Sequence, residues 1–311
     1  MLQTLSLQQK QALQENDIVL LRTSRTLQAD YELPEYFLRP ARIKSFQTWG
    51  EREPTVIFEL RSAQRRGLMR ETQIYALGQI SSSWETTETA YLSYLKQQAA
   101  DGDANAMYAL AEYYYENTST RDAYVFEQGM TQAKHYYHMA MDAGHAYASY
   151  RFAEKYRLIL TEPYLSHFAE DRQGNYQRYL IQSAEQGYQV AQYAVGYMYS
   201  YAKQGFPQDY AQCVYWYKKA AEQGYPEAMN NLGDKYEYGR GVPRDYVTAA
   251  YYYQQAVEQN IVEAIYNLGR LYLRGLGVEK DIEIGTQLLQ RAADRCYQPA
   301  RRKLKTLQQA K

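Results

Sequence analysis

The sequence predicts an α+β protein in two units. A small β-rich domain is expected over residues 1–80, followed by an all-α solenoid of helix-turn-helix repeats over residues 84–311. Small and aromatic residues recur in fixed columns from about residue 89 onward, at intervals near 36 residues. Before residue 80 the apolar residues instead form short runs that alternate with polar residues, as in β-strands.

The N-terminal eighty residues contain four runs that are typical of strands: Asp17–Arg22, Tyr36–Phe46, Thr55–Arg61 and Leu68–Leu77. A short helix, Ser6–Glu15, is expected before them, because Ser6 and Gln9 match a capping box. So many strands in this length predict a small, strongly bent antiparallel sheet or an SH3-like barrel. Arginines surround a predicted hairpin turn at Gly67, where either a solvated tip or a docking site for an acidic partner would account for them.

The repeats are defined by one landmark each: Gly102, Gly144, Gly187, Gly224, Asn260 and Cys296. Four residues after every landmark stands alanine, and eight residues before it stands a bulky residue. Nine and twelve residues after the first five landmarks stand a tiny residue and a tyrosine, respectively. These spacings trace one stripe on each of two helices. We therefore expect about five helix pairs in a right-handed array, with capping helices near 85–99 and 298–309.

Three details of the repeat can be predicted from the same columns. Glycine or asparagine at the landmark suits the left-handed conformation that ends a helix. Asp245 and Asp281 are expected to cap the second helices that follow them. Since Ala111 and Ala153 fill the tiny-residue column elsewhere, Gly233→Ala is expected to be tolerated.

This pattern resembles the Sel-one-like repeat (SLR), a relative of the tetratricopeptide repeat. The resemblance is carried by Asp209–Gly224 (DYAQCVYWYKKAAEQG), followed by Ala228, Leu232, Gly233 and Tyr236. It covers about residues 89–300. The resemblance implies a scaffold for protein–protein interactions, without a shared catalytic centre, whose first helices line a concave surface.

Composition argues against several classes of protein. The 35 Lys and Arg side chains balance the 35 Asp and Glu, so no basic field would concentrate nucleic acid. No apolar run approaches the roughly 20 residues that span a bilayer, and Met1–Leu21 lacks the apolar stretch of a secretory signal. Cys213 and Cys296 occupy different repeat positions too far apart for a disulfide. We expect a cytoplasmic protein with no nucleic-acid or membrane partner.

Candidates for catalytic or metal chemistry are few. His135, His138, Asp142 and His145 form a conceivable metal site, but the first two fall outside the buried stripe. The glycine pairs at 239–241 and 275–277 resemble phosphate loops, yet no strand precedes them and no Gly-Lys-Ser/Thr follows. They are interpreted as turns of the repeat. We expect no metal and no cofactor.

A partner surface is expected where the first helices face away from the core, at three, six, seven and ten residues after each landmark. Tyrosine offers contact area at low entropic cost, and asparagine can bond a partner's backbone. The candidate residues are Tyr108, Tyr147, Tyr150, Arg151, Glu154, Tyr193, Tyr197, Asn230, Asn231, Asp234, Tyr266, Asn267 and Arg270. In the alternative interpretation, some of these tyrosines pack against the adjacent repeat.

Three functional hypotheses follow. The first is a non-enzymatic scaffold or adaptor that binds a protein or peptide in the concave groove. The second, which rests on fold analogy alone, is a bacterial immunity protein that neutralises a cognate toxin by direct binding. The third is an enzyme with chemistry in the N-terminal domain or the His135–His145 region, disfavoured because no nucleophile–base pair is visible. The sequence leaves the oligomeric state open.

Overall fold

The computed structural model describes the backbone of residues 2–4, 18–22, 38–47, 55–60, 66–69, 74–77, 84–117, 123–158 and 172–309. Side chains are described for residues 88–115, 127–156 and 174–309. The chain forms two compact units, Met1–His145 and Ala146–Lys311. This division falls inside the helical region, and the predicted domain boundary near residue 80 stays a prediction.

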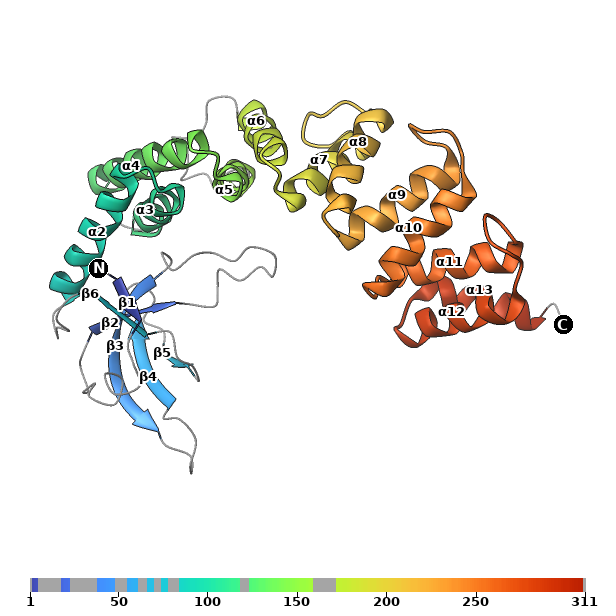
Figure 1. The fold of residues 1–311 in the computed structure, drawn as a ribbon, viewed down its shortest axis with the longest axis horizontal. Coiled ribbons are helices and arrows are strands. Elements are labelled where there is room, and N and C mark those ends of the chain that lie inside the picture. The colour runs from blue at the N-terminus through green and yellow to red at the C-terminus, as the bar shows by residue number, and fades with distance from the viewer. Residues whose placement is uncertain are drawn as a thin grey trace. The chain divides into compact units, whose positions relative to one another are not determined.

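The described residues of the first unit include six strands (Figure 1). They are β1 (Leu2–Thr4), β2 (Ile18–Arg22), β3 (Leu38–Gln47), β4 (Thr55–Leu60), β5 (Arg66–Met69) and β6 (Ile74–Leu77). They pair antiparallel in the order β1-β6-β2-β3-β4-β5, with a register shift between Ile43 and Ser45. The side chains of these strands and the predicted Ser6–Glu15 helix lie outside the described residues, so the SH3-like domain stays a prediction.

The first unit continues with three helices, α2 (Trp84–Ala100), α3 (Ala104–Asn117) and α4 (Ala123–Asp142). Helix α3 packs against α4 with its small and aromatic stripe, and Ala106, Leu110 and Ala111 are fully buried. The buried Glu112 carboxylate accepts hydrogen bonds from the hydroxyls of Tyr108 and Tyr137. These two bonds satisfy a charge that would otherwise be costly to bury.

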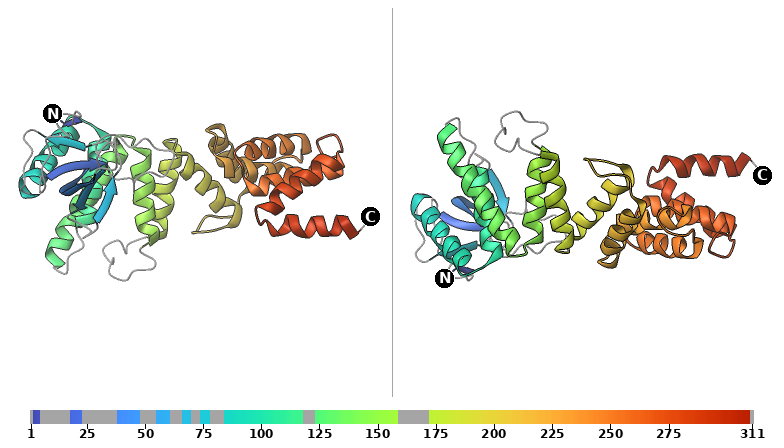
Figure 2. Two further views of the ribbon diagram at one scale, coloured as in Figure 1. Left: turned by 90° about the horizontal axis from the view of Figure 1, so that it is seen from below. Right: turned by 90° about the horizontal axis from the view of Figure 1, so that it is seen from above.

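The described secondary-structure elements of the second unit are all helices, joined by turns (Figures 1 and 2). Its elements are α5 (Ala146–Leu158), α6 (Arg172–Glu185), α7 (Gln189–Tyr201), α8 (Tyr210–Glu222), α9 (Pro226–Tyr238), α10 (Tyr246–Glu258), α11 (Val262–Arg274), α12 (Ile282–Asp294) and α13 (Gln298–Gln309). First and second helices alternate, and consecutive helices pack together. Over both units the described residues contain twelve helices, α2 to α13, which confirms the predicted helical solenoid. Its predicted right-handed curvature stays a prediction.

The helix ends are fixed by residues that recur in each repeat. Asp245 accepts hydrogen bonds from the backbone N–H groups of Val247 and Thr248, and Asp281 accepts one from Ile284. Both predicted caps are thus confirmed, and they satisfy donors that the first turn leaves open. The landmarks Gly224, Asn260 and Cys296 have φ of +88°, +65° and +64°, as expected for residues that end a helix in the left-handed region.

Two buried tyrosines pack directly on glycines of the preceding first helix. A Cβ on Gly233 would lie 2.7 Å from Cδ1 of Tyr253, and a Cβ on Gly196 would lie 2.6 Å from Cδ1 of Tyr217. Both rings are fully buried and have little room to move. The expectation that Gly233→Ala is tolerated is therefore wrong, because the tyrosine ring occupies the space that the added methyl group would need.

The turn within each repeat lies against the second helix of the repeat before it. A Cβ on Gly241 would lie 2.2 Å from the carbonyl oxygen of Tyr210, and one on Gly277 would lie 2.0 Å from that of Tyr246. Both glycines also have positive φ. Only glycine fits such a position. These glycines therefore allow the backbones of adjacent repeats to approach closely. This contact agrees with the interpretation of the two loops as turns of the repeat.

Candidate partner-binding site

Two of the predicted site residues are buried. Tyr108 is 1% exposed, with its ring 4.9 Å from that of His145, and Tyr147 is 6% exposed, with its ring 5.5 Å from that of Tyr188. Position in the repeat places these side chains on the first helices, but neighbouring aromatic rings cover them. We correct the prediction for both, since neither side chain is available to a partner.

The predicted residues of α5 are half-buried. Tyr150 packs its ring 5.2 Å from the ring of Tyr188, in the next repeat. Arg151 and Glu154 are likewise half-buried and take part in contacts within the protein. For Tyr150 the geometry favours the alternative interpretation, in which a tyrosine stabilises the junction between repeats.

The remaining candidates come together on α7, α9 and α11. Each is half-buried, and each projects from a first helix. We call this surface the first-helix face, defined as Tyr193, Tyr197, Asn230, Asn231, Asp234, Tyr266, Asn267 and Arg270.

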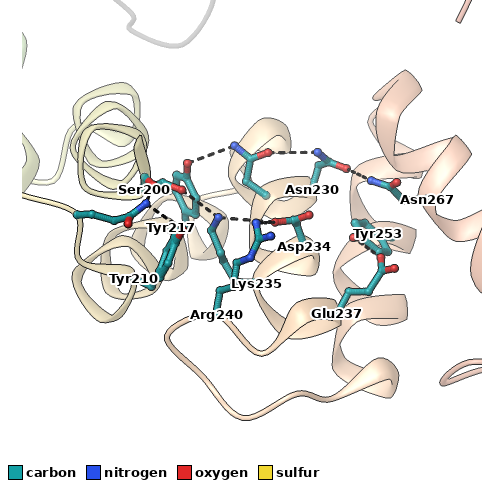
Figure 3. Close-up of polar contacts among 12 residues, drawn as sticks. Ser200, Tyr210, Tyr217, Asn230, Asp234, Lys235, Glu237, Arg240, Tyr253 and Asn267 are labelled. Carbon is teal, nitrogen blue, oxygen red and sulfur yellow. Dashed lines mark hydrogen bonds and ion pairs between the residues drawn. The ribbon is translucent and has the colours of Figure 1, made fainter. Parts of the chain in front are cut away.

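A chain of amide hydrogen bonds crosses the first-helix face from repeat to repeat (Figure 3). Asn267 Nδ2 donates to Asn230 Oδ1 at 3.2 Å, and Asn230 Nδ2 donates to Asn231 Oδ1 at 3.2 Å. Asn231 Nδ2 lies 3.4 Å from the hydroxyl of Tyr193 and 3.3 Å from that of Tyr217. Tyr193 and the three predicted amides thus form one connected network, which also includes Tyr217.

The hydrogen bonds of this network all point the same way along it, and two of its amides have a second N–H group. Arg270 Nη1 donates to Asn267 Oδ1 at 3.2 Å, so a cation stands at one end and tyrosine hydroxyls at the other. An amide carries two N–H donors, and Asn230 and Asn267 each use one of them with a partner among the described residues. No described residue accepts a hydrogen bond from the second N–H group of either side chain.

Beside this chain, Glu237 is buried as a charge. It is 3% exposed and accepts hydrogen bonds from the Arg270 guanidinium and, at 2.9 Å, from the Tyr253 hydroxyl. Burial, together with the nearby Glu237 carboxylate, raises the pKa of Tyr253, so its hydroxyl stays protonated and donates. The arrangement holds Arg270 in place at the end of the amide chain.

A second buried charge, Lys235, lies on the opposite side of α9. Its Nζ is 2.9 Å from Ser200 Oγ and 3.6 Å from Asp234 Oδ2, while Arg240 Nη1 is 4.0 Å from the same Asp234 oxygen (Figure 3). The Lys235 ammonium also lies 5.3 Å from the centre of the Tyr210 ring. Lys235 is thus enclosed by polar and aromatic groups of two repeats.

The Ser200–Lys235 contact has the geometry of a nucleophile and its base, and it bears on the enzyme hypothesis. Ser200 is 2% and Lys235 is 3% exposed, so a substrate could not reach the hydroxyl. Burial raises the pKa of the neighbouring Cys213 thiol to about 11, which keeps it protonated and unreactive. Burial thus leaves a substrate no access to this pair.

Five further residues with polar or aromatic contacts near this face were not predicted: Tyr201, Lys203, Lys235, Glu237 and Arg240. A signal was present for the buried pair. Lys235 stands where the adjacent repeats have Met198 and Leu271, and Glu237 stands where they have Ser200 and Leu273. A charge at a position where both adjacent repeats carry an uncharged residue indicates a role that the repeat itself does not need.

The histidine region gives no support to a metal site. His135 and His138 are exposed on α4, whereas His145, which follows the end of α4 in the chain, is buried. Among the described residues, no group of three or more His, Cys, Asp or Glu side chains could hold a metal ion. None of the described helices is long and apolar enough to cross a membrane.

Comparison with protein families identifies the repeat. The Sel1 repeat model matches residues 189–225, 226–261 and 262–295, which are the helix pairs α7–α8, α9–α10 and α11–α12. The chain contains three Sel1 repeats. The predicted SLR resemblance is therefore confirmed, and the first-helix face lies within these Sel1 repeats.

Solved structures share this fold. A protective antigen of uropathogenic Escherichia coli with an SLR fold is 31% identical, with a TM-score of 0.53, over 68% of this chain and 43% of its own. A Sel1 repeat protein from Oxalobacter formigenes is 26% identical, with a TM-score of 0.51, over 68% of this chain and 57% of its own. This chain thus spans about half the length of each. No curated protein matches it.

An immunity protein from Pseudomonas aeruginosa is also similar. It is 18% identical, with a TM-score of 0.32, over 68% of this chain and 74% of its own. A similarity of this size reflects the repeated helices and carries no inference about function.

Proposed function

We propose that this Sel1-repeat protein is a non-enzymatic adaptor whose first-helix face binds a protein or peptide partner. The proposal includes the finer expectations made from the sequence: a concave face, a separate β-rich domain before the repeats and a cytoplasmic location. The immunity hypothesis remains a special case of such binding, with a toxin as the partner.

The observation that carries the proposal is the amide chain with its unused donors. Asn230 and Asn267 stand one repeat apart, are joined side chain to side chain, and each keep an N–H group. Asparagine side chains can bond the peptide groups of an extended chain, and the flanking tyrosines Tyr193 and Tyr266 can supply apolar contact area. Because the amides fix one another, little side-chain entropy would be lost when a partner binds.

Affinity capture with matched variants tests the proposal. The immobilised full chain would be exposed to lysate of its native cells, and bound proteins would be quantified by mass spectrometry. Asn230→Ala/Asn267→Ala removes the amide chain, whereas Tyr215→Ala/Tyr251→Ala changes two exposed tyrosines on the second helices α8 and α10. We expect the first variant to lose a partner that the second retains, with both variants folded by circular dichroism.

Two results would contradict the proposal. A partner lost only by the Tyr215→Ala/Tyr251→Ala variant would lie on the second helices. A partner retained by both variants would bind elsewhere on the chain.

A further inference from the structure

We propose that one end of the first-helix face is a subsite for the carboxylate side chains of an acidic, extended peptide segment. The subsite, here called the Tyr201 patch, consists of Tyr197, Tyr201, Lys203, Asp234, Lys235 and Arg240. This inference rests on the proposed function and names the chemistry of the partner.

Charge is unbalanced in the Tyr201 patch. Lys235 Nζ and Arg240 Nη1 both approach the same oxygen of Asp234, at 3.6 and 4.0 Å, so two cations share one carboxylate. Lys203 is exposed, and its Nζ donates instead to the hydroxyl of Tyr197 at 2.9 Å. Three cations against one carboxylate leave two positive charges unbalanced. A surface of this kind attracts anions and rejects cationic segments.

An exposed aromatic ring lies among these charges. Tyr201 is 55% exposed, and its ring centre is 5.7 Å from Lys203 Nζ and 5.9 Å from Lys235 Nζ. The ring of Tyr197 lies 4.6 Å from it and continues the aromatic surface toward the amide chain. Burial and the nearby Asp234 raise the pKa of Tyr201, so the phenol keeps a proton to donate. Tyrosine and arginine are the residues on which binding energy most often concentrates.

The repeat does not need Lys235. Met198 and Leu271 fill this column in the adjacent repeats, and a buried ammonium is costly unless it is fully paired. Among the described residues, Lys235 donates one hydrogen bond, to Ser200 Oγ, and the Asp234 oxygen at 3.6 Å is beyond hydrogen-bonding distance. Lys155, buried two repeats earlier at the same position, shows that the column accommodates a lysine stem. Lys235 therefore maintains a positive charge beneath the patch and acts there as a positioning residue.

The exposed cations come from equivalent places in adjacent repeats. Lys203 lies in the turn after α7, and Arg240 lies 37 residues later in the turn after α9. Ala202 and Gln204, on either side of Lys203, have φ of +51°, where the next turn has Gly239 and Gly241. Non-glycine residues in this region are uncommon and often occur where a loop has a binding role.

The spacing of these cations suits an extended peptide. Adjacent repeats stack roughly 10 Å apart, and an extended chain rises about 3.3 Å per residue. Two acidic side chains about three residues apart would thus reach both Lys203 and Arg240. The backbone between the acidic side chains and the next residues would continue toward Asn230 and Asn267.

Selection from a random displayed library of dodecapeptides on the intact protein tests this inference. We expect Asp and Glu to be enriched among the selected peptides. For a synthesised, end-capped peptide of this kind, Lys203→Gln/Arg240→Gln should weaken binding by tenfold or more, and so should Glu→Gln and Asp→Asn changes in the peptide. Lys219→Gln, on the outer side of α8, is the matched control and should leave the affinity unchanged.

Lys235→Met separates binding from folding. It installs the residue that the preceding repeat carries, so we expect an unchanged or higher melting temperature together with weaker peptide binding. A lower melting temperature with unchanged affinity would assign Lys235 to structure and overturn its part in the patch.

The other outcomes distinguish the two proposals. Peptides that depend on Asn230 and Asn267 but not on the three cations would overturn the acidic subsite and leave the proposed function intact. A library without any peptide that depends on the amides or the cations would overturn both. If an oligothymidylate probe bound with the same dependence on Lys203 and Arg240 while acidic peptides did not, the patch would be a phosphate site.

Discussion

Asn267 donates a hydrogen bond through Nδ2 to Oδ1 of Asn230, 3.2 Å away and 37 residues earlier in the chain. The bond links the first helices α11 and α9 of two adjacent repeats. It repeats the chemistry of the Asn230–Asn231 bond within α9, so three amides act as one element across two Sel1 repeats. A side-chain network of this kind orders its members before a ligand arrives.

Single and double replacements of Asn230 and Asn267 by alanine should reveal this coupling. Each single variant should lose about 0.5–1.5 kcal/mol of unfolding free energy, because the bonds are half-buried. The double variant should lose less than the sum, by about 0.5 kcal/mol or more, since both changes remove the same bond. Urea unfolding followed by circular dichroism measures the three values. Strict additivity would show that the two amides do not interact in solution.

Removal of the buried carboxylate from the Glu237–Arg270 ion pair should lower the unfolding free energy strongly. Glu237→Leu supplies the residue of the next repeat, Leu273, but leaves the Tyr253 hydroxyl and Arg270 without their acceptor. We expect a loss of about 3 kcal/mol or more. Adding Arg270→Leu should recover part of this lost stability, because it removes the guanidinium that has lost its acceptor. A Glu237→Leu variant as stable as the wild type would show that the carboxylate contributes nothing to the fold.

Two glycines with similar φ should respond differently to substitution. Gly241→Ala would bring a Cβ to 2.2 Å from the Tyr210 carbonyl oxygen, whereas a Cβ on Gly224 meets nothing within 4 Å. Gly241→Ala should therefore cost about 2–5 kcal/mol through strain and overlap. Gly224→Asn should cost less than about 1 kcal/mol, because Asn260 holds the same place one repeat later. Thermal melting compares the two, and equal losses would show that the backbone contact is not rigid.

The sequence predicted the repeats well because their columns reflect close packing. Alanine stands four residues after every landmark, and Ala106, Ala148, Ala191, Ala228, Ala264 and Ala300 are all fully buried. A larger side chain at these positions would separate the helices. Because of the same constraint, the positions of the helix pairs can be predicted from the sequence.

The partner surface was predicted less well. A column of the repeat indicates on which side of its helix a side chain lies, but not which neighbouring side chains pack against it. Tyr193 and Asn267 are half-buried on first helices and their role in binding stays a prediction, whereas Tyr108 is covered by the ring of His145. The close packing of the Tyr253 ring on Gly233 was also not predicted, because it depends on which residues stand in two columns of the repeat at once. Lys235 and Glu237 could have been found by asking where a charged residue replaces the uncharged residues of both adjacent repeats.

The buried imidazole of His145 makes the stability of the protein depend on pH. Burial lowers the pKa of His145 from its ordinary 6.5 to about 4, with the Asp103 carboxylate opposing the shift. Above pH 7.5 the imidazole is neutral in both the folded and the unfolded chain, and its titration contributes nothing. Between pH 6.5 and 4 the unfolded chain binds a proton that the folded chain does not, so the unfolding free energy falls as the pH falls.

His145→Tyr isolates this contribution, because Tyr188, Tyr225 and Tyr297 hold the equivalent position in other repeats. The tyrosine carries no charge in this pH range, so carboxylates that titrate alike in both proteins cancel from the comparison. From pH 7.5 to pH 5, the wild type should lose about 2 kcal/mol more unfolding free energy than the variant, at about 1.4 kcal/mol per pH unit below 6.5. Urea unfolding of both full-length proteins at the two pH values measures this difference. If the wild type and the variant lost stability equally, the imidazole would have to accept its proton in the folded protein as readily as in the unfolded chain.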